Sequence, residues 1–325
     1  MKVTVLMPIY NAEKYICEAI DSLLVQTSSN WKLICIDDGS TDSSASIVEN
    51  YCVKDKRIKL ICQTNAGPAV ARAKAIEIVD TEYISILDSD DAYASNYVEL
   101  MLKRAEETNA DSIVPDVEFG YGNTKKMPNI FTTNQLDINM EINDGRQAFA
   151  LTIPWKLHGW QMIRTTLAKQ YYTVEQASYS NFNSDEYITR LLYLKSKKTV
   201  LCPACYQYRI ANDSITRTPS IKKLDYLKTL DKLVDLCRNE QIDIHIQIEL
   251  YNDFYMTLIN MWRLINQLPQ KDRTLARNLV KTSYHNVYCA KFPKKIWRVA
   301  PLKTSIKFAI SMIGFKTIKW MAQKS

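Results

Sequence analysis

Three carboxylates within four residues are the feature of this sequence with the clearest chemistry. Asp88, Asp90 and Asp91 follow residues 83–86, a short apolar run that predicts a buried β-strand. Asp88 and Asp90 are two positions apart, so in an extended chain their side chains point to the same side. Two carboxylates at one point repel each other unless a cation lies between them, and such hard oxygen ligands suit Mg²⁺ or Mn²⁺. The alternative is an Asp-rich turn in which Asp90 or Asp91 caps the next helix.

Strands alternate with helices through the part of the chain that positions these carboxylates. Apolar runs predict strands at residues 3–7, 33–36, 58–62 and 83–87. Apolar residues at helical spacing predict helices at residues 13–27, 41–51 and 68–79. This alternation predicts an α/β fold with a mainly parallel, doubly wound sheet, whose ligands bind beyond the carboxyl ends of the strands. Polar residues gather at those ends: Tyr10, Asn11, Asp37, Asp38, Asn65, Asp88 and Asp90.

The later part of the chain has weaker patterns. Residues 92–113 predict a further helix and residues 113–115 a further strand, and the chain is then polar and irregular to about residue 143. Beyond residue 216 the spacing of apolar residues is helical, most clearly over residues 246–268.

The composition is that of an ordinary folded protein, with 46% hydrophobic and 24% charged residues among 325. The sequence opens with no secretory signal pattern and contains no run of 18 apolar residues. We therefore expect a cytoplasmic protein without a membrane-spanning helix.

Positive charge is concentrated at the end of the chain, because no acidic residue follows Asp272. Residues 302–313 place apolar and basic side chains on opposite helical faces, with Trp297 and Trp320 nearby. This basic tail favours an anionic membrane surface as a partner, and we expect peripheral binding to the inner face of the cell membrane. The alternative is a helix packed on the protein's own core. We expect no nucleic-acid partner.

Four short motifs resemble the motif series of family 2 glycosyltransferases, which have the GT-A fold. They are residues 8–11 (PIYN), 37–42 (DDGSTD), 65–72 (NAGPAVAR) and 88–91 (DSDD). The resemblance covers about residues 1–115. It implies a GT-A (Rossmann-like) domain that moves a sugar, with inversion, from a nucleotide-sugar donor, usually a UDP-sugar. Extension of a bacterial surface polysaccharide or lipid-linked oligosaccharide is the setting that it implies.

The resemblance also implies roles for individual residues. Asp38 would accept a hydrogen bond from uracil, and Arg72 would neutralise phosphate charge. Asp90, with Asp88, would ligate the Mn²⁺ or Mg²⁺ that stabilises the departing diphosphate as a Lewis acid. The full donor-binding set would be Pro8, Tyr10, Asp37, Asp38, Asn65, Arg72, Asp88, Ser89 and Arg209.

A second acidic motif, Asp185-Glu186, precedes a predicted helix and resembles the family's catalytic-base motif, usually written Glu-Asp. Here Ser184 stands before Asp185, so the register leaves Asp185 and Glu186 as alternatives. We expect Asp185 to be the base. A carboxylate with an ordinary pKa of about 4 is already ionised at neutral pH, so it needs no special activation for this task. The alternative is that Ser184 or Asp185 caps the helix.

Residues 153–160 resemble the segment that leads towards the acceptor in many family members. Trp155 and Trp160 would stack on a sugar face, and His158 would contribute to the acceptor site. Plain packing of the tryptophans and a structural role for the histidine are the alternatives.

These inferences divide the chain into a donor half (1–115), an acceptor half (116–215) and a helical region (216–325). We expect a metal-dependent, inverting hexosyl- or N-acetylhexosaminyl-transferase that acts on a hydroxyl of a glycan or lipid-linked acceptor. A sugar nucleotidyltransferase is one alternative, but it predicts a Gly-rich phosphate loop that the sequence lacks. A non-catalytic, membrane-associated scaffold is the other.

Overall fold

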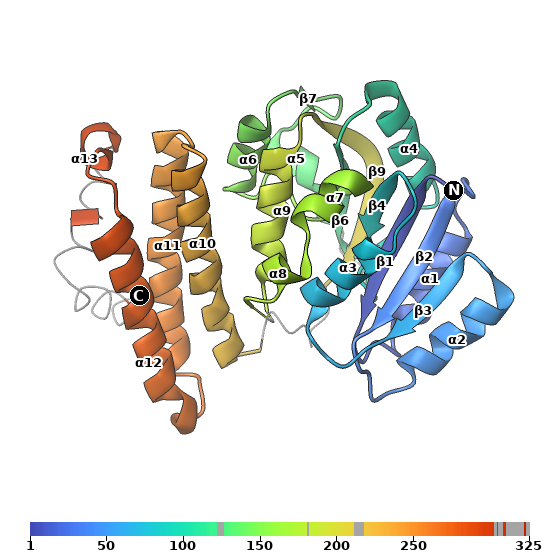
Figure 1. The fold of residues 1–325 in the computed structure, drawn as a ribbon, viewed down its shortest axis with the longest axis horizontal. Coiled ribbons are helices and arrows are strands. Elements are labelled where there is room, and N and C mark those ends of the chain that lie inside the picture. Colours follow the sequence, from blue (N-terminus) through green and yellow to red (C-terminus); the bar gives the residue numbers. More distant parts are fainter. Residues whose placement is uncertain are drawn as a thin grey trace. The chain divides into compact units, whose positions relative to one another are not determined.

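The computed structural model describes residues 1–121, 127–180, 182–210, 218–301, 304, 308, 309 and 322. The chain forms two compact units, Met1–Asn212 and Asp213–Ser325. The first is an α/β unit, and the second is built from helices (Figure 1). This confirms the predicted fold class, an α/β domain followed by a helical region.

A mixed, mostly parallel sheet forms the centre of the first unit. Within the described residues it has nine strands in the order β3-β2-β1-β4-β8-β6-β9-β5, and β7 pairs with β9. The strands are β1 (Val3–Ile9), β2 (Trp31–Asp37), β3 (Ile58–Cys62), β4 (Tyr83–Ile86), β5 (Ala92–Tyr93), β6 (Ser112–Tyr121), β7 (Glu141–Ile142), β8 (Met162–Arg164) and β9 (Thr199–Arg209). Strands β1–β4, β6 and β9 run parallel, whereas β5, β7 and β8 run antiparallel to them.

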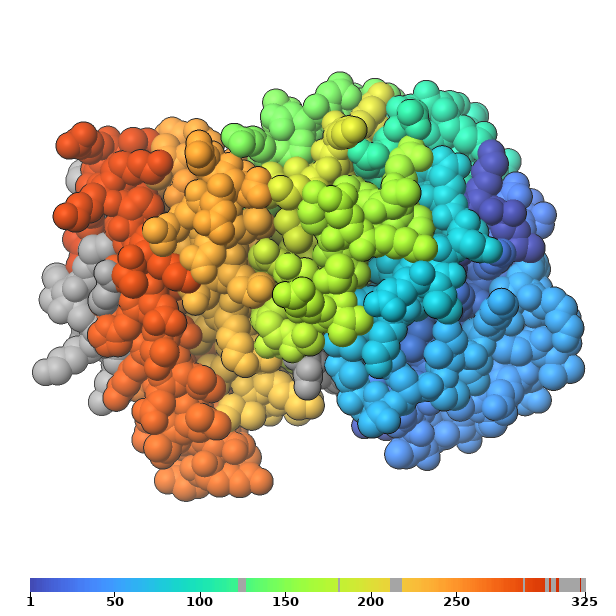
Figure 2. All heavy atoms as spheres, in the orientation of Figure 1, coloured from blue at the N-terminus to red at the C-terminus, as the bar shows by residue number. Residues whose placement is uncertain are grey.

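Helices cover both faces of this sheet, and every residue of β1 is buried. They are α1 (Ile16–Leu24), α2 (Ser44–Lys54), α3 (Pro68–Glu77), α4 (Tyr97–Thr108), α5 (Ile130–Asn134), α6 (Gly145–Thr152), α7 (Thr165–Tyr171), α8 (Val174–Ala177) and α9 (Ser184–Lys195). Helix α3 contacts β1, β2, α7 and α8. In the space-filling view, α3 and the α7–α9 segment lie side by side at the surface of the first unit (Figure 2).

The register of the parallel strands brings their carboxyl ends to one edge. Ile9 pairs with Asp37, and Asp37 pairs with Cys62. The fourth strand ends at the same edge, where the Leu87 N–H donates to the carbonyl oxygen of Leu6 at 3.1 Å. The polar segments that follow these strands therefore begin next to one another, as the strand pattern predicted.

Two elements have other bounds than the sequence predicts, because residues in them pair with β9, which is distant in the chain. The predicted helix at residues 92–113 begins only at Tyr97, since Ala92 and Tyr93 form β5 against β9. The predicted strand at residues 113–115 extends to Tyr121, since β6 pairs with β9 along most of its length. The expected division at residue 115 falls inside β6, so the two halves share a continuous strand.

The second unit consists of η1 (Ile221–Leu224), α10 (Asp225–Asn239), α11 (Ile244–Ile265), α12 (Gln270–Tyr284), the π-helical turn η2 (His285–Lys291) and α13 (Ile296–Val299). The ammonium of Lys291 joins η2 to α10 through Asp231 and Asp235, at 2.5 and 2.6 Å. Within the described ranges, no helix is long and apolar enough to cross a membrane. Most of the predicted amphipathic tail helix, residues 302–313, and Trp320 lie outside the described residues.

A buried histidine ties β6 to the segment before β8. The Nε2 atom of His158 lies 2.9 Å from the carbonyl oxygen of Pro115 and must donate to it, while Nδ1 accepts from the Trp160 N–H at 3.3 Å. Burial lowers the pKa of His158 to about 4, although the hydrogen bond to Pro115 and the charge of Asp116 act in the opposite direction. The folded state therefore holds a neutral imidazole.

We expect His158 to make the first unit less stable as the pH falls. The ordinary histidine pKa is 6.5 and the folded value is about 4, so protonation favours the unfolded chain once the pH drops below the first value. Between pH 7 and pH 4.5 the free energy of unfolding should fall by about 2–3 kcal/mol from this group alone. Urea unfolding at both pH values should show this loss in the wild type and in the exposed-histidine control His245→Gln. An equal loss in His158→Gln would contradict the assignment.

Candidate active site

A charged cluster lies at the carboxyl edge of the sheet, where three distant segments meet. Arg72 of α3 donates from Nη2 to Oδ1 of Asp88, directly after β4, at 2.7 Å. Its Nη1 donates to Oδ2 of Asp185, in the first turn of α9, at 3.3 Å. The indole Nε1 of Trp160 donates to the second oxygen of Asp88 at 3.3 Å. Four predicted site residues therefore share one hydrogen-bond network.

Arg72 is the buried centre of this network. Burial lowers the pKa of its guanidinium, but the charges of Asp88 and Asp185 act in the opposite direction and the pKa is raised overall. Tyr172 follows α7 and is itself buried beside Arg72, and burial raises the pKa of its hydroxyl to about 12. The arginine is thus a permanent cation held between two carboxylates and a neutral phenol.

The two acidic residues at the start of α9 have different surroundings. The side chain of Asp185 is 43% exposed and reaches Arg72. The side chain of Glu186 is 15% exposed and accepts from Nη2 of Arg190 at 2.9 Å and from Nδ2 of Asn183 at 3.4 Å. Only Asp185 joins the described network at the carboxyl edge, and it is also the more accessible of the two to a ligand.

The three carboxylates after β4 also separate into different environments. Asp91 is buried and accepts from the Tyr206 hydroxyl at 2.7 Å and from the Arg209 N–H at 2.8 Å. Burial and the charges of Asp88 and Asp90 raise its pKa to about 8, so Asp91 is largely uncharged at neutral pH. The same Tyr206 hydroxyl accepts from the Asp88 N–H at 3.2 Å. Asp91 therefore holds the turn together, whereas Asp88 lies in the Arg72 network and Asp90 is exposed.

These two carboxylates fit a divalent cation. Neither Asp90 nor Asp91 caps the next helix, because the N-cap of α4 is Asn96. Mg²⁺ and similar ions are commonly held by one or two carboxylates together with substrate phosphates, not by a protein cage. Within the described ranges, no group of three or more His, Cys, Asp or Glu side chains is arranged to hold a metal. Ser89, between the two carboxylates, is half-buried.

Asp38 builds the loop that leads into α3. Its carboxylate accepts from Nε2 of Gln63 at 2.7 Å and from the N–H groups of Ala66 and Gly67, each at 2.8 Å. Gly67 has φ +90°, a backbone conformation that favours glycine, and it is the N-cap of α3. A carboxylate can accept about four hydrogen bonds, and these donors already occupy three of the positions on Asp38. A donor from a ligand can therefore bind only in addition to these three bonds.

The neighbouring donor-site candidates surround this loop. Asp37 is buried and accepts from the Ser40 N–H at 3.2 Å. Gly39 has φ +79°, and a Cβ atom there would lie 3.2 Å from the backbone nitrogen of Asn65. Asn65 itself is exposed. The two strand-end loops therefore pack closely, and of these residues only Asn65 has an exposed side chain.

The end of β1 presents one exposed aromatic ring. Pro8 is buried within the strand, whereas Tyr10, the first residue beyond it, is exposed. The next residue, Asn11, has φ +51°, and its Oδ1 accepts from the Thr41 N–H at 2.8 Å. The turn after β1 is thus fixed to the turn after β2, and the Tyr10 ring remains available for stacking.

Arg209, the last residue of β9, contacts the turn that carries Asp90. Its Nε donates to the carbonyl oxygen of Asp90 at 2.9 Å, and its guanidinium pairs with Glu18 of α1. The guanidinium carbon lies 4.9 Å from the Tyr15 ring centre and 5.0 Å from that of Tyr121. The described contacts of this arginine hold the turn from outside and include none with Asp88 or Asp185.

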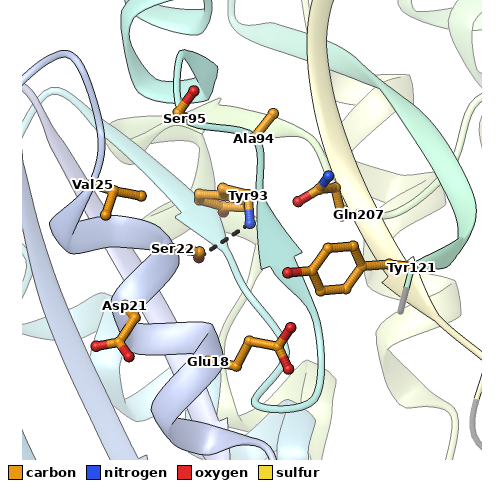
Figure 3. A pocket seen from close by; sticks show the side chains of 9 residues that line it. All are labelled: Glu18, Asp21, Ser22, Val25, Tyr93, Ala94, Ser95, Tyr121 and Gln207. Atoms are coloured by element: carbon orange, nitrogen blue, oxygen red, sulfur yellow. Dashed lines mark hydrogen bonds between the residues drawn. The ribbon is translucent and has the colours of Figure 1, made fainter. Parts of the chain in front are cut away.

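A shallow hollow lies beside this arginine. Figure 3 shows the Glu18 carboxylate and the Tyr121 hydroxyl facing each other across it. Its lining is Glu18, Asp21, Ser22, Val25, Tyr93, Ala94, Ser95, Tyr121 and Gln207. None of the residues of the Arg72 network lines it, so the hollow is separate from the candidate site.

The three acceptor candidates have different degrees of access. Trp155 is 39% exposed, and the guanidinium carbon of Arg190 lies 4.3 Å from its ring centre. Trp160 is half-buried and stacks on Tyr206 with ring centres 4.9 Å apart. His158 is buried with both ring nitrogens bonded to the backbone, so it can offer a nitrogen to an acceptor only by breaking one of those bonds.

Sequence reasoning missed three residues that shape this site: Tyr172, Tyr206 and Arg190. Tyr206 carries the one available signal, since it alternates with Tyr208 along an apolar run as strand residues do. Tyr172 and Arg190 contact their partners only through tertiary packing, which no local sequence pattern predicts.

Comparison with known proteins identifies the family. A family model described as "Glycosyl transferase family 2" matches residues 4–170. The glycosyltransferase GlyA of Streptococcus pneumoniae is 28% identical, over an alignment that covers 99% of this chain and 49% of GlyA. The chain thus spans about half the length of this relative.

Two solved structures share the fold. TarS 1-349 of S. aureus, in complex with UDP-GlcNAc, gives a TM-score of 0.73 at 18% identity and covers 99% of this chain and 90% of its own. The mannosyltransferase PcManGT from Pyrobaculum calidifontis, in complex with GDP-Man and Mn²⁺, gives a TM-score of 0.55 at 14% identity and covers 98% of this chain and 82% of its own. The likeness to TarS confirms the predicted GT-A fold. The family model spans half of the chain, including the segments that carry Arg72 and Asp88, and the chain therefore belongs to glycosyltransferase family 2.

Proposed function

We propose that this chain transfers a sugar from a UDP-sugar to a hydroxyl of a glycan or lipid-linked acceptor, with inversion at the anomeric carbon. The network that joins Arg72, Asp88 and Asp185 is the observation that carries the proposal. It places a permanent cation beside an accessible carboxylate at the edge of the sheet where ligands of such folds bind. The UDP-GlcNAc complex of TarS supports UDP-N-acetylhexosamine as the first donor to test.

Asp185 acts as the general base in this proposal. It accepts the proton of the acceptor hydroxyl while that oxygen forms a bond to the anomeric carbon. The bond from the anomeric carbon to the diphosphate oxygen breaks, and its electron pair leaves with UDP. Attack on the face opposite the leaving group gives inversion. Arg72 orients the Asp185 carboxylate through the 3.3 Å hydrogen bond and adds positive charge where the diphosphate becomes more negative.

Asp88 and Asp90 would hold Mn²⁺ or Mg²⁺. When bound, the ion would supply Lewis-acid stabilisation of the departing diphosphate. The protein's own contribution is to fix the turn: Asp91 and Tyr206 hold it from within, and Arg209 holds the Asp90 carbonyl from outside. The Mn²⁺ complex of PcManGT supports testing this ion first.

The nucleotide would lie against the loops after β1, β2 and β3. Tyr10 offers an exposed ring for the uracil base, with Pro8 buried behind it. Asp37, Asp38, Asn65 and Ser89 complete the proposed donor set. Residues 1–115 would then form the donor half and residues 116–215 the acceptor half, with Trp155 and Trp160 facing the acceptor.

We also propose that the protein binds an anionic membrane surface on the cytoplasmic side and meets a lipid-linked acceptor there. The basic side chains of Lys281, Lys294, Lys295 and Arg298 are exposed and support this placement.

We expect Asp90→Asn to abolish metal-dependent donor turnover. Loss of one of two carboxylates removes charge that a divalent cation requires, so Mn²⁺-stimulated UDP-sugar hydrolysis should fall by a factor of about 100 or more. The matched control is Asp80→Asn, an exposed aspartate paired only with Lys32 among the described residues. Unchanged hydrolysis in Asp90→Asn would remove this residue from the metal site.

We expect Asp185→Asn to lower kcat for transfer by a factor of about 10² to 10⁴, the usual contribution of a general base. Binding of the UDP-sugar, followed by thermal shift, should persist. The neighbouring variant Glu186→Gln serves as the comparison and should keep kcat within about tenfold of the wild type, because Glu186 pairs with Arg190 and not with Arg72. The reverse pattern would assign the base to Glu186.

A further inference from the structure

The corner between α7 and α8 carries a buried phenol next to the Arg72 network. Tyr172 is the C-cap residue of α7, and only 4% of it is exposed. Its N–H donates to the carbonyl oxygen of Ala168 at 2.7 Å. The next residue, Thr173, caps α8 by accepting from the Gln176 N–H at 3.2 Å. The backbone around Tyr172 is therefore fixed on both sides.

This corner packs against both helices that supply the network. Helices α7 and α8 each contact α3, which carries Arg72, and α9, which carries Asp185 in its first turn. The Tyr172 side chain interacts with the charges of Arg72, Asp185 and Asp88. Burial raises the pKa of its hydroxyl to about 12, so the hydroxyl is neutral at ordinary pH. The phenol thus lies among these charges without adding one.

Two complementary polar atoms lie here without a hydrogen bond. In the part of the chain that the structure describes, neither Nε of Arg72 nor the hydroxyl of Tyr172 has a hydrogen-bond partner, although both atoms are buried. Nε can only donate, whereas a phenol oxygen can accept. The Nη atoms of Arg72 are occupied, Nη2 by Asp88 at 2.7 Å and Nη1 by Asp185 at 3.3 Å. A donor and an acceptor on interacting side chains therefore remain unjoined.

The Tyr172 hydroxyl is not explained by packing. A buried hydroxyl without a partner costs stability, whereas a phenylalanine ring of nearly the same shape would avoid that cost. The hydroxyl is explained by a second state of the site in which it has a partner. The longer of the two Arg72 bonds, to Asp185, is the weaker one, so a turn of the guanidinium that gives it up costs least.

We propose that Tyr172 is a positioning residue whose hydroxyl accepts a hydrogen bond from Nε of Arg72 when a nucleoside diphosphate occupies the site. This inference rests on the proposed function, because it takes Arg72 as the cation that meets the diphosphate. Phosphate oxygens would then take the Nη atoms, and Tyr172 would hold the third nitrogen of the same guanidinium. A neutral acceptor suits this task, because another carboxylate would compete with the diphosphate for the positive charge.

The test compares the UDP affinity of the wild type and of Tyr172→Phe by calorimetric titration in the presence of Mg²⁺. The variant loses only the hydroxyl, so it should bind UDP about 3 to 30 times more weakly, while its unfolding temperature without ligand should stay the same or rise. A merely structural tyrosine would give the opposite pattern, a lower unfolding temperature and an unchanged affinity. Tyr171→Phe is the matched control, because Tyr171 ends the same helix and its ring centre lies 5.9 Å from the Lys195 ammonium.

A double-mutant cycle tests whether the hydroxyl acts through Arg72. Arg72→Lys places a carbon where arginine has Nε, so adding Tyr172→Phe to it should change the UDP affinity by less than a factor of about 2. A further loss as large as in the wild-type background would overturn the proposal. An unchanged affinity in Tyr172→Phe alone, or an equal loss in Tyr171→Phe, would do the same.

A measurement on the wild type keeps the proposal testable if Tyr172→Phe does not fold. In protein labelled with ¹⁵N-arginine, the Nε–H signal that disappears in Arg72→Lys belongs to Arg72. It should move downfield in ¹H when UDP and Mg²⁺ are added, and an unmoved signal at saturation would overturn the proposal. A wild type that shows these effects of UDP but transfers no sugar would overturn the proposed function and leave the role of Tyr172 in place. No UDP binding by the wild type would overturn both.

Discussion

The candidate site depends on one ion-pair network, in which the buried Arg72 joins Asp88 to Asp185. Each partner comes from a different element: α3, the end of β4 and the start of α9. Arg72 is buried, so removing either carboxylate would leave its charge less fully compensated. The three elements are therefore held in one arrangement by the same charges that a diphosphate and an acceptor hydroxyl would meet.

The position of Arg72 depends in turn on the Asp38 carboxylate, which takes no part in the proposed transfer step. Asp38 binds the N–H groups of Ala66 and Gly67, which fixes where α3 begins and thus where Arg72 lies, about one turn into the helix. The Asp91–Tyr206 hydrogen bond does the same for the turn that carries Asp88 and Asp90. Buried polar groups with satisfied hydrogen bonds hold both loops, so the exposed groups keep their geometry without a ligand.

The sequence predicted the elements that local patterns encode. The first four strands and three helices follow from apolar runs and helical spacing, and Asp88 is among the polar residues at the strand ends. Arg72 and Asp185 were predicted only through the resemblance to family 2 motifs. The pairing of β5 and β6 with β9 was not predictable in this way, since it joins segments about a hundred residues apart in the chain. For the same reason, the sequence could not distinguish the surroundings of Asp91 from those of Asp90, or of Glu186 from those of Asp185. The burial of Asp91 and the pairing of Glu186 with Arg190 exist only in the folded molecule. The roles of the predicted site residues remain predictions.

The continuity of the sheet limits how the first unit can move. Strand β6 crosses from the proposed donor half into the acceptor half, and β8 links it to β4 through ladder hydrogen bonds. Hinge closure of one half on the other, as in enzymes with two lobes, would require breaking that ladder. Any opening and closing during turnover must therefore come from the segments that connect the strands. The strand ends from which these segments begin then keep one arrangement while the segments themselves move.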